Sequence, residues 1–188
     1  PVINGLSDVE HPCQAVADFL TILEKKKKLK GLTLAYVGDS NNNVTHSLIH
    51  GATLVGMNMK IGCPRGKEFS PDPKIVAQAR KLGGKVFVTD NPTEAVKNAD
   101  VVYTDSWTSY RIPASQRNKR MKLLKPYQVN TDLMRHAKKN ALFMHCLPAL
   151  RGMEVTKGVI DGKQSVVFDQ AENRLHTEKA ILLRALKA

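Results

Sequence analysis

The segment Leu32-Thr33-Leu34-Ala35-Tyr36-Val37 is almost continuously apolar, and Gly31 and Gly38 bound it. A short apolar run of this kind is typical of a strand that is buried on both faces of a parallel sheet. Upstream, residues 14–23 carry apolar side chains at three- and four-residue spacing, which predicts an amphipathic helix. We therefore expect a helix followed by a buried strand, the repeating pattern of an α/β fold.

The same alternation continues through the rest of the chain. Helical patterns cover residues 44–55, 73–82, 92–98, 131–138 and 172–186. Strand-like patterns cover residues 57–61, 86–89, 101–104, 141–145 and 165–168. This alternation predicts an α/β fold with a doubly wound, mainly parallel, Rossmann-like sheet and helices on both faces. No linker-like segment divides the chain, so residues 1–188 are expected to form one domain.

The composition limits the class of protein. A chain of 188 residues with 42% apolar residues can bury a sizeable core. Its apolar runs stay well short of the roughly 18 residues of a membrane span, and its first residues do not resemble a secretory signal. We therefore expect a cytoplasmic protein with no membrane partner. The cysteines Cys13, Cys63 and Cys146 include no C-x-x-C pair, which disfavours a disulfide framework or a zinc site.

The net charge of +12 is compatible with a nucleic acid, an anionic surface or a phosphorylated substrate as partner. The densest basic run, Glu24-Lys25-Lys26-Lys27-Lys28-Leu29-Lys30, comes directly before Gly31. Cations in the last turn of a helix, followed by a glycine stop, explain this run. Few aromatic residues interleave with the lysines, as stacking on bases would require. A solvated helix end is therefore favoured over a nucleic-acid patch.

Polar clusters follow several of the predicted strands, at residues 38–43, 105–113, 145–148 and 169–174. Because ligands bind at the carboxyl ends of parallel strands, these clusters are expected to line one crevice. The loop Gly38-Asp39-Ser40-Asn41-Asn42-Asn43 lacks G-x-G-x-x-G and a P-loop lysine, which disfavours a nucleotide site. Its asparagines could equally cap the following helix.

The candidate reactive residues also have structural interpretations. Asp105 could pair with a cationic amine of a substrate or cap a turn. His145 and Cys146 are adjacent, and neighbours on an extended strand point to opposite faces, which disfavours a cysteine hydrolase. Read alone, His145 fits a buried histidine whose hydrogen bonds are satisfied.

Three motifs resemble those of the ornithine carbamoyltransferases. His11-Pro12-Cys13-Gln14 is similar to HPCQ, His145-Cys146-Leu147-Pro148 to HCLP, and Gln170-Ala171-Glu172-Asn173-Arg174-Leu175 to a run near the end of that family's chain. The resemblance covers essentially the whole chain and corresponds to the second half of the family's polypeptide. It implies that residues 1–188 form the ornithine-binding (C-terminal) domain, without the carbamoyl phosphate domain and its S-x-R-T loop. Such a chain should be almost inactive alone.

The resemblance also implies roles for individual residues. The residues implied to bind carbamoyl phosphate are His11, Gln14, Cys146, Leu147 through its carbonyl, and Arg174. Those implied to bind ornithine are Asn43, Asp105, Ser109, Tyr110 and Cys146. Asn42 is the alternative to Asn43. The catalytic residues would be Cys146, Asp105, Arg174 and His11. The resemblance implies no metal and no cofactor, and Cys13 is expected to be structural.

One loop departs from the family pattern D-x-W-x-S-M-G, because Tyr110 and Arg111 replace a methionine and a glycine. Arg111 lacks the backbone freedom of glycine, so this loop does not determine which amine is the substrate. Alternatives are another amine, such as putrescine or an acylated ornithine, and a non-catalytic binding module. The implied partners are ornithine, carbamoyl phosphate and the carbamoyl phosphate domain, with a homotrimer or a multiple of trimers for the full-length enzyme and no nucleic acid.

Overall fold

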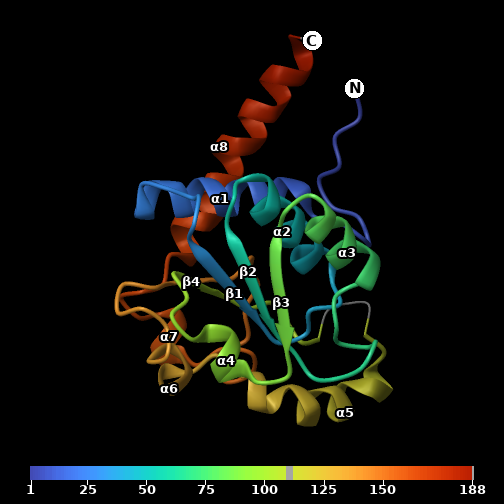
Figure 1. The fold of residues 1–188 in the computed structure, drawn as a ribbon, viewed down its shortest axis with the longest axis vertical. Coiled ribbons are helices and arrows are strands. Elements are labelled where there is room, and N and C mark those ends of the chain that lie inside the picture. The colour runs from blue at the N-terminus through green and yellow to red at the C-terminus, as the bar shows by residue number, and fades with distance from the viewer. Residues whose placement is uncertain (109–111, 188) are drawn as a thin grey trace.

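The computed structural model describes residues 1–108 and 112–187, and its centre is a sheet of five parallel strands (Figure 1). The strands are β1 (Thr33–Val37), β2 (Asn58–Gly62), β3 (Lys85–Thr89), β4 (Val101–Tyr103) and β5 (Leu142–Met144). Their order in the sheet is β3-β2-β1-β4-β5, and every neighbouring pair is parallel. The predicted α/β class and doubly wound parallel sheet are therefore confirmed.

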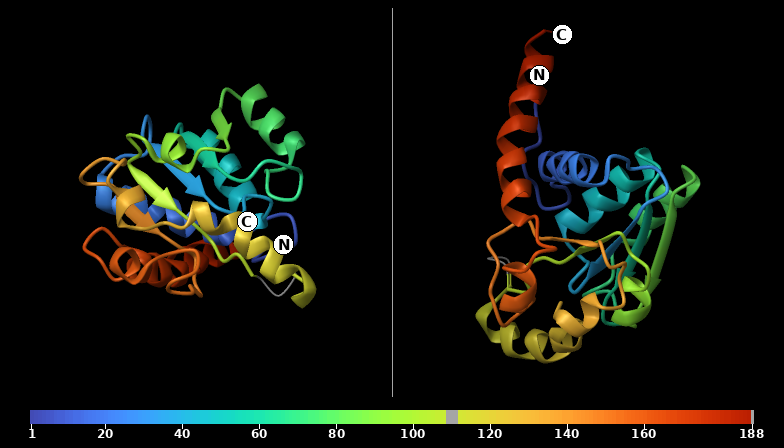
Figure 2. Two further views of the ribbon diagram at one scale, coloured as in Figure 1. Left: turned by 90° about the horizontal axis from the view of Figure 1, so that it is seen from below. Right: turned by 90° about the vertical axis from the view of Figure 1, so that its left-hand side faces the viewer.

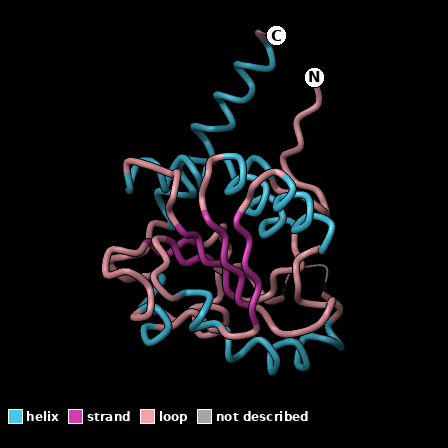
Figure 3. The backbone as a smooth tube through the Cα atoms, viewed as in Figure 1, coloured by secondary structure: helices cyan, strands magenta, loops and turns pink. Residues whose placement is uncertain are grey.

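Helices cover both faces of this sheet (Figure 3). One face packs against α1 (Pro12–Lys26), α2 (Asn43–Leu54) and α3 (Pro73–Lys81). The other packs against α4 (Pro92–Val96), α6 (Thr131–Met134) and α7 (Lys157–Ile160). The remaining helices are α5 (Ala114–Leu124), the 3-10 turn η1 (Lys125–Tyr127) and α8 (Val167–Leu186).

The first strand shows why the sequence forms two cores. Leu34 and Tyr36 contribute to one apolar cluster, whereas Ala35 and Val37 contribute to the other, and none of the four is exposed. Successive side chains of a strand point to opposite faces, so a strand with helices on both sides must be apolar throughout. The continuous apolar character of this segment therefore places β1 in the middle of the sheet.

Helix α8 has two different environments. Its first half packs on α1 and is tied to it by buried hydrogen bonds, whereas Leu182, Leu183 and Leu186 in its second half are exposed. Figure 1 and the right-hand view of Figure 2 show this second half extending beyond the sheet, on the same side as the N-terminus. None of the helices in the described ranges has the length and apolar character of a membrane span.

Two predicted features at the end of the chain are wrong. Residues 165–168 are not a strand, because only Ser165 forms an isolated bridge, to Phe143, and α8 already begins at Val167. Residues 169–174 consequently lie inside a helix rather than in a loop. A short apolar run such as Val166-Val167-Phe168 fits either a strand or a helix, so its pattern could not decide between them.

The basic run does end a helix, but Gly31 is not its stop. Helix α1 ends at Lys26, and Lys27 adopts the left-handed conformation with φ of 61°. The Lys25 ammonium lies 2.7 Å from Asp169 of α8, and the Lys26 ammonium donates to the carbonyl of Asn140. These lysines therefore join α1 to neighbouring segments of the chain.

Candidate functional site

The sheet order places a topological switch point between β1 and β4. Strand β1 pairs with β2 on one side and with β4 on the other, so the connections from these two strands diverge at their carboxyl ends. A topological switch point of this kind is where ligands bind in open α/β sheets. The loops that follow β1, β4 and β5 begin with Gly38, Thr104 and His145.

The pairing of β4 with β5 brings Asp105 and Cys146 together. Tyr103 is in register with Met144, and Asp105 and Cys146 each lie two residues farther along. The Cys146 thiol donates a hydrogen bond of 3.1 Å to Oδ1 of Asp105. Burial and the Asp105 charge raise the pKa of the thiol well above its usual value. Cys146 is therefore a neutral hydrogen-bond donor rather than a thiolate nucleophile.

The His145 side chain is buried, as predicted, but its Nε2 has no hydrogen-bond partner among the described residues. The side chain is fully buried, and Nδ1 accepts a hydrogen bond of 2.9 Å from the Leu147 amide. Its Nε2 lies 3.4 Å from Oε1 of the buried Glu154, which also accepts from the Leu150 amide. These contacts fix the chain from His145 to Leu150. The Leu147–Pro148 peptide is cis, and Leu147 has a φ of 59°.

His11, Gln14 and Arg174 form a second cluster, at the junction of α1 and α8. Arg174 donates from Nη1 to Oε1 of Gln14 at 2.7 Å and from Nε to Glu178 at 2.9 Å. His11 and Arg174 line a cavity of about 570 Å³ that the N-terminal segment partly covers. Arg174 was expected near the start of a helix, but it lies two turns inside α8.

His11 connects the two clusters electrostatically. Its side chain is buried, and Nδ1 has no hydrogen-bond partner among the described residues. Burial and the Arg174 charge lower the pKa of His11, whereas the Asp105 carboxylate opposes this change. The imidazole is therefore neutral near pH 7, and it is close enough to respond to charges from both clusters.

The asparagines after β1 have structural partners. Asn42 caps α2 by accepting a hydrogen bond of 2.8 Å from the Thr45 amide. The side-chain amide of Asn43 donates a hydrogen bond of 2.8 Å to the backbone carbonyl of Ser7. The capping interpretation therefore holds for Asn42. Asn43, on the first turn of α2, faces the N-terminal segment.

Part of the predicted site cannot be placed. Ser109, Tyr110 and Arg111 lie outside the described residues. The residues just before them are described: Trp107 is buried, and Asp105 accepts a hydrogen bond of 2.7 Å from the Ser106 amide. Asp105 therefore combines a local turn contact with its contact to Cys146.

Asp105, His145 and Cys146 each bring one potential metal ligand within 4.8 Å of the others, and no other such group occurs in the described ranges. Nδ1 of His145 already accepts from a backbone amide, and the Cys146 proton is shared with Asp105. A metal ligand needs a free lone pair and, for cysteine, a thiolate. These contacts use Nδ1 of His145 and the proton of Cys146 within the protein, whereas Nε2 of His145 has no hydrogen-bond partner among the described residues.

A contribution of Asp18 to this region was not predictable from sequence. Asp18 lies on the buried face of α1, one turn after Gln14, and is fully buried. Its carboxylate accepts hydrogen bonds from Gln14, Tyr103 and Gln170. A single acidic residue among apolar positions was the only signal for this cluster, and it does not reveal the partners.

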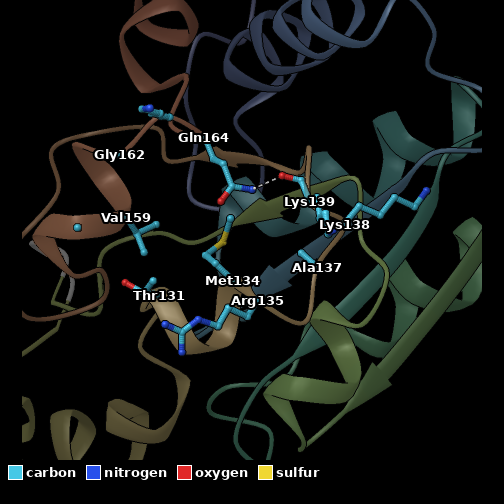
Figure 4. Close-up of a pocket in the computed structure, with 11 residues that line it drawn as sticks. Thr131, Met134, Arg135, Ala137, Lys138, Lys139, Val159, Gly162 and Gln164 are labelled. Carbon is cyan, nitrogen blue, oxygen red and sulfur yellow. Dashed lines mark hydrogen bonds between the residues drawn. The ribbon is translucent and has the colours of Figure 1, made fainter.

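A further cavity of about 400 Å³ lies at the opposite, amino ends of β4 and β5, between α6 and α7 (Figure 4). Met134 and Val159 contribute its apolar part, and the Gln164 amide donates to the carbonyl of Lys139. None of the candidate site residues lines it.

Comparisons with known proteins agree with the sequence motifs. The family described as "Aspartate/ornithine carbamoyltransferase, Asp/Orn binding domain" matches residues 30–185. Among curated relatives, the ornithine carbamoyltransferase of Picrophilus torridus is 50% identical over 99% of this chain and 62% of its own length. That of Thermococcus kodakarensis is 53% identical over 97% of this chain and 58% of its own.

Solved structures give the same result. The ornithine carbamoyltransferase from Pyrococcus furiosus superimposes with a TM-score of 0.89 at 50% identity, covering 97% of this chain and 58% of that protein. The enzyme from Giardia lamblia has a TM-score of 0.87 at 39% identity and covers 95% and 60%. The chain thus spans about 60% of the length of the relatives it matches.

Proposed function

Because this chain belongs to the Asp/Orn binding domain family of the aspartate/ornithine carbamoyltransferases, we propose that it is the ornithine-binding part of an ornithine carbamoyltransferase. The enzyme would transfer the carbamoyl group of carbamoyl phosphate to the side-chain amine of ornithine, giving citrulline and phosphate. The observation that carries this proposal is the pair of hydrogen-bonded contacts, from the Cys146 thiol to Asp105 and from Arg174 to Gln14, both within electrostatic range of His11. Groups suited to an anion and to an amine thus meet in one crevice.

Arg174, Gln14 and His11 would bind carbamoyl phosphate. In the reaction a C–N bond forms, the C–O bond to phosphate breaks, and the carbonyl oxygen gains negative charge in between. Neutral His11 can donate one N–H to that oxygen, and Arg174 adds positive charge. The Leu147 carbonyl, held by the His145 contact to the Leu147 amide, is assigned to the carbamoyl nitrogen.

Asp105 and Cys146 would position ornithine. An alkyl ammonium has a pKa near 10.4 in water and attacks only after losing a proton. Asp105 is a suitable hydrogen-bond acceptor for the ammonium. Burial and the Arg174 charge would lower the pKa of this ammonium, and the departing phosphate can take up the proton that it loses. Asn43 is assigned to the amino-acid backbone of ornithine. Ser109 and Tyr110 remain predicted members of this subsite.

The remaining part of the enzyme would supply the carbamoyl phosphate domain. The cavity beside His11 is lined by Ile3 and Leu6 of the N-terminal segment and by Ile181 and Leu182 of α8. The exposed leucines on the second half of α8 extend this apolar surface. We assign it to contact with that domain. A homotrimer or a multiple of trimers, and a cytoplasmic location, stay predictions.

The two alternatives differ in their support. The hypothesis of another amine substrate depends on Tyr110 and Arg111. These two residues lie outside the described part of the chain, so they favour no particular amine. A nucleic-acid-binding module depends on the lysine run, but Lys25 and Lys26 contact other segments of this chain. Ornithine therefore remains the proposed substrate.

The experiment is a citrulline assay of this chain joined to a carbamoyl phosphate domain, with ornithine, putrescine and N-acetylornithine supplied separately. The proposal expects turnover with ornithine and loss of most of that turnover in Asp105→Asn. Faster turnover of putrescine or N-acetylornithine would reassign the substrate. Absence of transfer to any of the three would reject the carbamoyltransferase function.

A further inference from the structure

Asp18 is a buried carboxylate whose hydrogen-bond partners among the described residues are neutral groups. Its Oδ1 accepts from Nε2 of Gln14 at 2.8 Å and from Nε2 of Gln170 at 2.7 Å. Its Oδ2 accepts from the Tyr103 hydroxyl at 3.1 Å. Within the described part of the chain, no cation pairs with it at salt-bridge distance. A buried carboxylate usually has a cationic partner. Because Asp18 has none among the described residues, ion pairing does not explain its burial.

The two glutamines that contact Asp18 lead to different parts of the candidate site. The oxygen of Gln14 accepts from Arg174 at 2.7 Å. The oxygen of Gln170 accepts from the backbone amide of His145 at 3.0 Å, directly before Cys146. Asp18 therefore lies at the centre of a hydrogen-bonded chain that reaches Arg174 at one end and the Cys146 segment at the other.

The charge state of Asp18 determines the orientation of the side-chain amides of Gln14 and Gln170. An ionised carboxylate accepts hydrogen bonds only, so each glutamine must present its NH₂ group to Asp18 and its oxygen outward. Those outward oxygens are the ones that hold Arg174 and the His145 amide. A protonated Asp18 is a donor as well as an acceptor and no longer requires this orientation.

Asp18 can change charge close to neutral pH. Burial raises its pKa to about 7, although the hydrogen bonds and the charge of Arg174 oppose the increase. The titratable groups that face it are the Tyr103 phenol from β4, Arg174 from α8 and the Cys146 thiol after β5. Burial and its neighbours raise the pKa of Tyr103 and of Cys146, so Asp18 is the group of this cluster that titrates near pH 7.

We propose that Asp18 is a positioning residue, whose ionised carboxylate orients Gln14 and Gln170 and thereby aligns Arg174 and the Cys146 segment for catalysis. Protonation releases both amides, so the alignment weakens below neutral pH. Asp18 itself touches no substrate. This inference rests on the proposed function of the crevice, and it adds a pH-dependent control of that site.

The first test uses this chain without any substitution. In a pH titration followed by NMR, the side-chain amide signals of Gln14 and Gln170 should shift together, with a common midpoint near pH 7. Gln128 and Gln164 are internal controls, because their amides donate to backbone carbonyls that do not titrate. Signals of Gln14 and Gln170 that stay constant between about pH 5.5 and about pH 8.5 would overturn the proposal.

The second test measures kcat/KM for carbamoyl phosphate in the joined enzyme with Asp18→Asn. We expect a deficit of about tenfold near pH 8 that shrinks to less than about twofold near pH 5.5, where Asp18 is mostly protonated in the unsubstituted protein. A deficit of equal size at both pH values, or none, would contradict a positioning role. Inactivity of the unsubstituted joined enzyme would instead reject the proposed function.

Thr21→Val is the matched control. Thr21 is also fully buried on α1 and accepts a hydrogen bond of 3.0 Å from Asn173 of α8. This contact joins the same two helices but does not lead to Arg174 or Cys146. Its loss should lower thermal stability while leaving the pH dependence of kcat/KM unchanged. A pH dependence in Thr21→Val like that of Asp18→Asn would mean that general loosening of the α1–α8 contact explains both.

Discussion

The Cys146 thiol donates a hydrogen bond of 3.1 Å to the carboxylate of Asp105, although 41 positions separate the two residues in the chain. The parallel register of β4 and β5 creates this contact, because each residue lies two positions beyond a paired strand residue. The position of Cys146 relative to Asp105 therefore depends on the sheet as much as on the loops.

Asp105→Asn removes the charge that we assign to the substrate ammonium. A hydrogen bond to a charged group is worth about 1.5–3 kcal/mol, so kcat/KM for ornithine should fall by about 10- to 100-fold. Steady-state kinetics of the joined enzyme at fixed carbamoyl phosphate measures this effect. An unchanged kcat/KM would remove Asp105 from the amine subsite.

Cys146→Ser should have a smaller effect, because a hydroxyl can still donate to Asp105 and the thiol is neutral in the folded protein. We expect about tenfold lower kcat/KM for ornithine, from the changed size and donor strength. Complete loss of activity would indicate a thiolate reaction instead. Cys63→Ser is the control, because Cys63 is buried beside Ser70 and outside both candidate clusters.

Arg174→Lys tests the carbamoyl phosphate subsite. The guanidinium contacts Gln14 and Glu178 at the same time, and a lysine ammonium cannot reproduce this fork. The KM for carbamoyl phosphate should rise by about tenfold or more, with a smaller change for ornithine. Arg135→Lys, at an exposed ion pair with Asp132, should leave both values unchanged. Equal effects of the two substitutions would contradict the assignment of Arg174.

Asp39 should make stability depend on pH. It contacts Arg120, yet burial raises its pKa to about 7, above the ordinary value of 3.8. The folded state therefore binds more protons than the unfolded state between about pH 4 and about pH 7, and the free energy of unfolding falls as pH rises through this window. The full effect is at most about 4 kcal/mol for such a change in pKa.

Urea unfolding at several pH values measures this dependence. Asp18 contributes in the same direction, since its pKa is also about 7. Asp39→Asn should flatten the pH dependence while lowering stability, because the buried Arg120 then keeps, among the described residues, only Glu68 as an ion-pair partner. A pH dependence that Asp39→Asn leaves intact would show that Asp39 ionises normally.

Gly51→Ala should disturb the contact between α1 and α2. A Cβ at this position would lie 2.1 Å from the Phe19 ring, which is buried. Overpacking of this kind costs about 1–3 kcal/mol, measurable as a lower urea midpoint. Gly158→Ala in α7 is the control, since its Cβ would meet only Thr131 Oγ1 at 3.6 Å. Equal stability of the two variants would mean that α1 moves away without cost.

The strands of the sheet were predictable from sequence because each is a short apolar run between turn residues. The segment at 32–37, for example, differs from the observed β1 by one residue. Helix α5 was not anticipated, because it buries only Arg120 and Leu124 and so has little apolar periodicity. The pattern of residues 165–168 was ambiguous, and the start of α8 was therefore misplaced.

Candidate site residues could be predicted where they lie in a local sequence motif. They could not be predicted where folding brings distant segments together. His11, Gln14, Cys146 and Arg174 were all predicted from family-like runs, and their roles stay predictions. Asp18 was not, because its partners Tyr103 and Gln170 are 85 and 152 positions away in the chain. A hydrogen-bond network of this kind depends on the packing of α1, β4 and α8, which a local pattern does not contain.

A competition between two amines, followed through the carbamoyl carbon, tests directly whether this chain binds ornithine. This chain, joined to a carbamoyl phosphate domain, is given carbon-labelled carbamoyl phosphate and an equimolar mixture of ornithine and putrescine. We predict that the label appears mainly in citrulline and that Asp105→Asn strongly reduces its rate of appearance. Label mainly in carbamoylputrescine, or in neither product, would contradict the assignment of this crevice to ornithine.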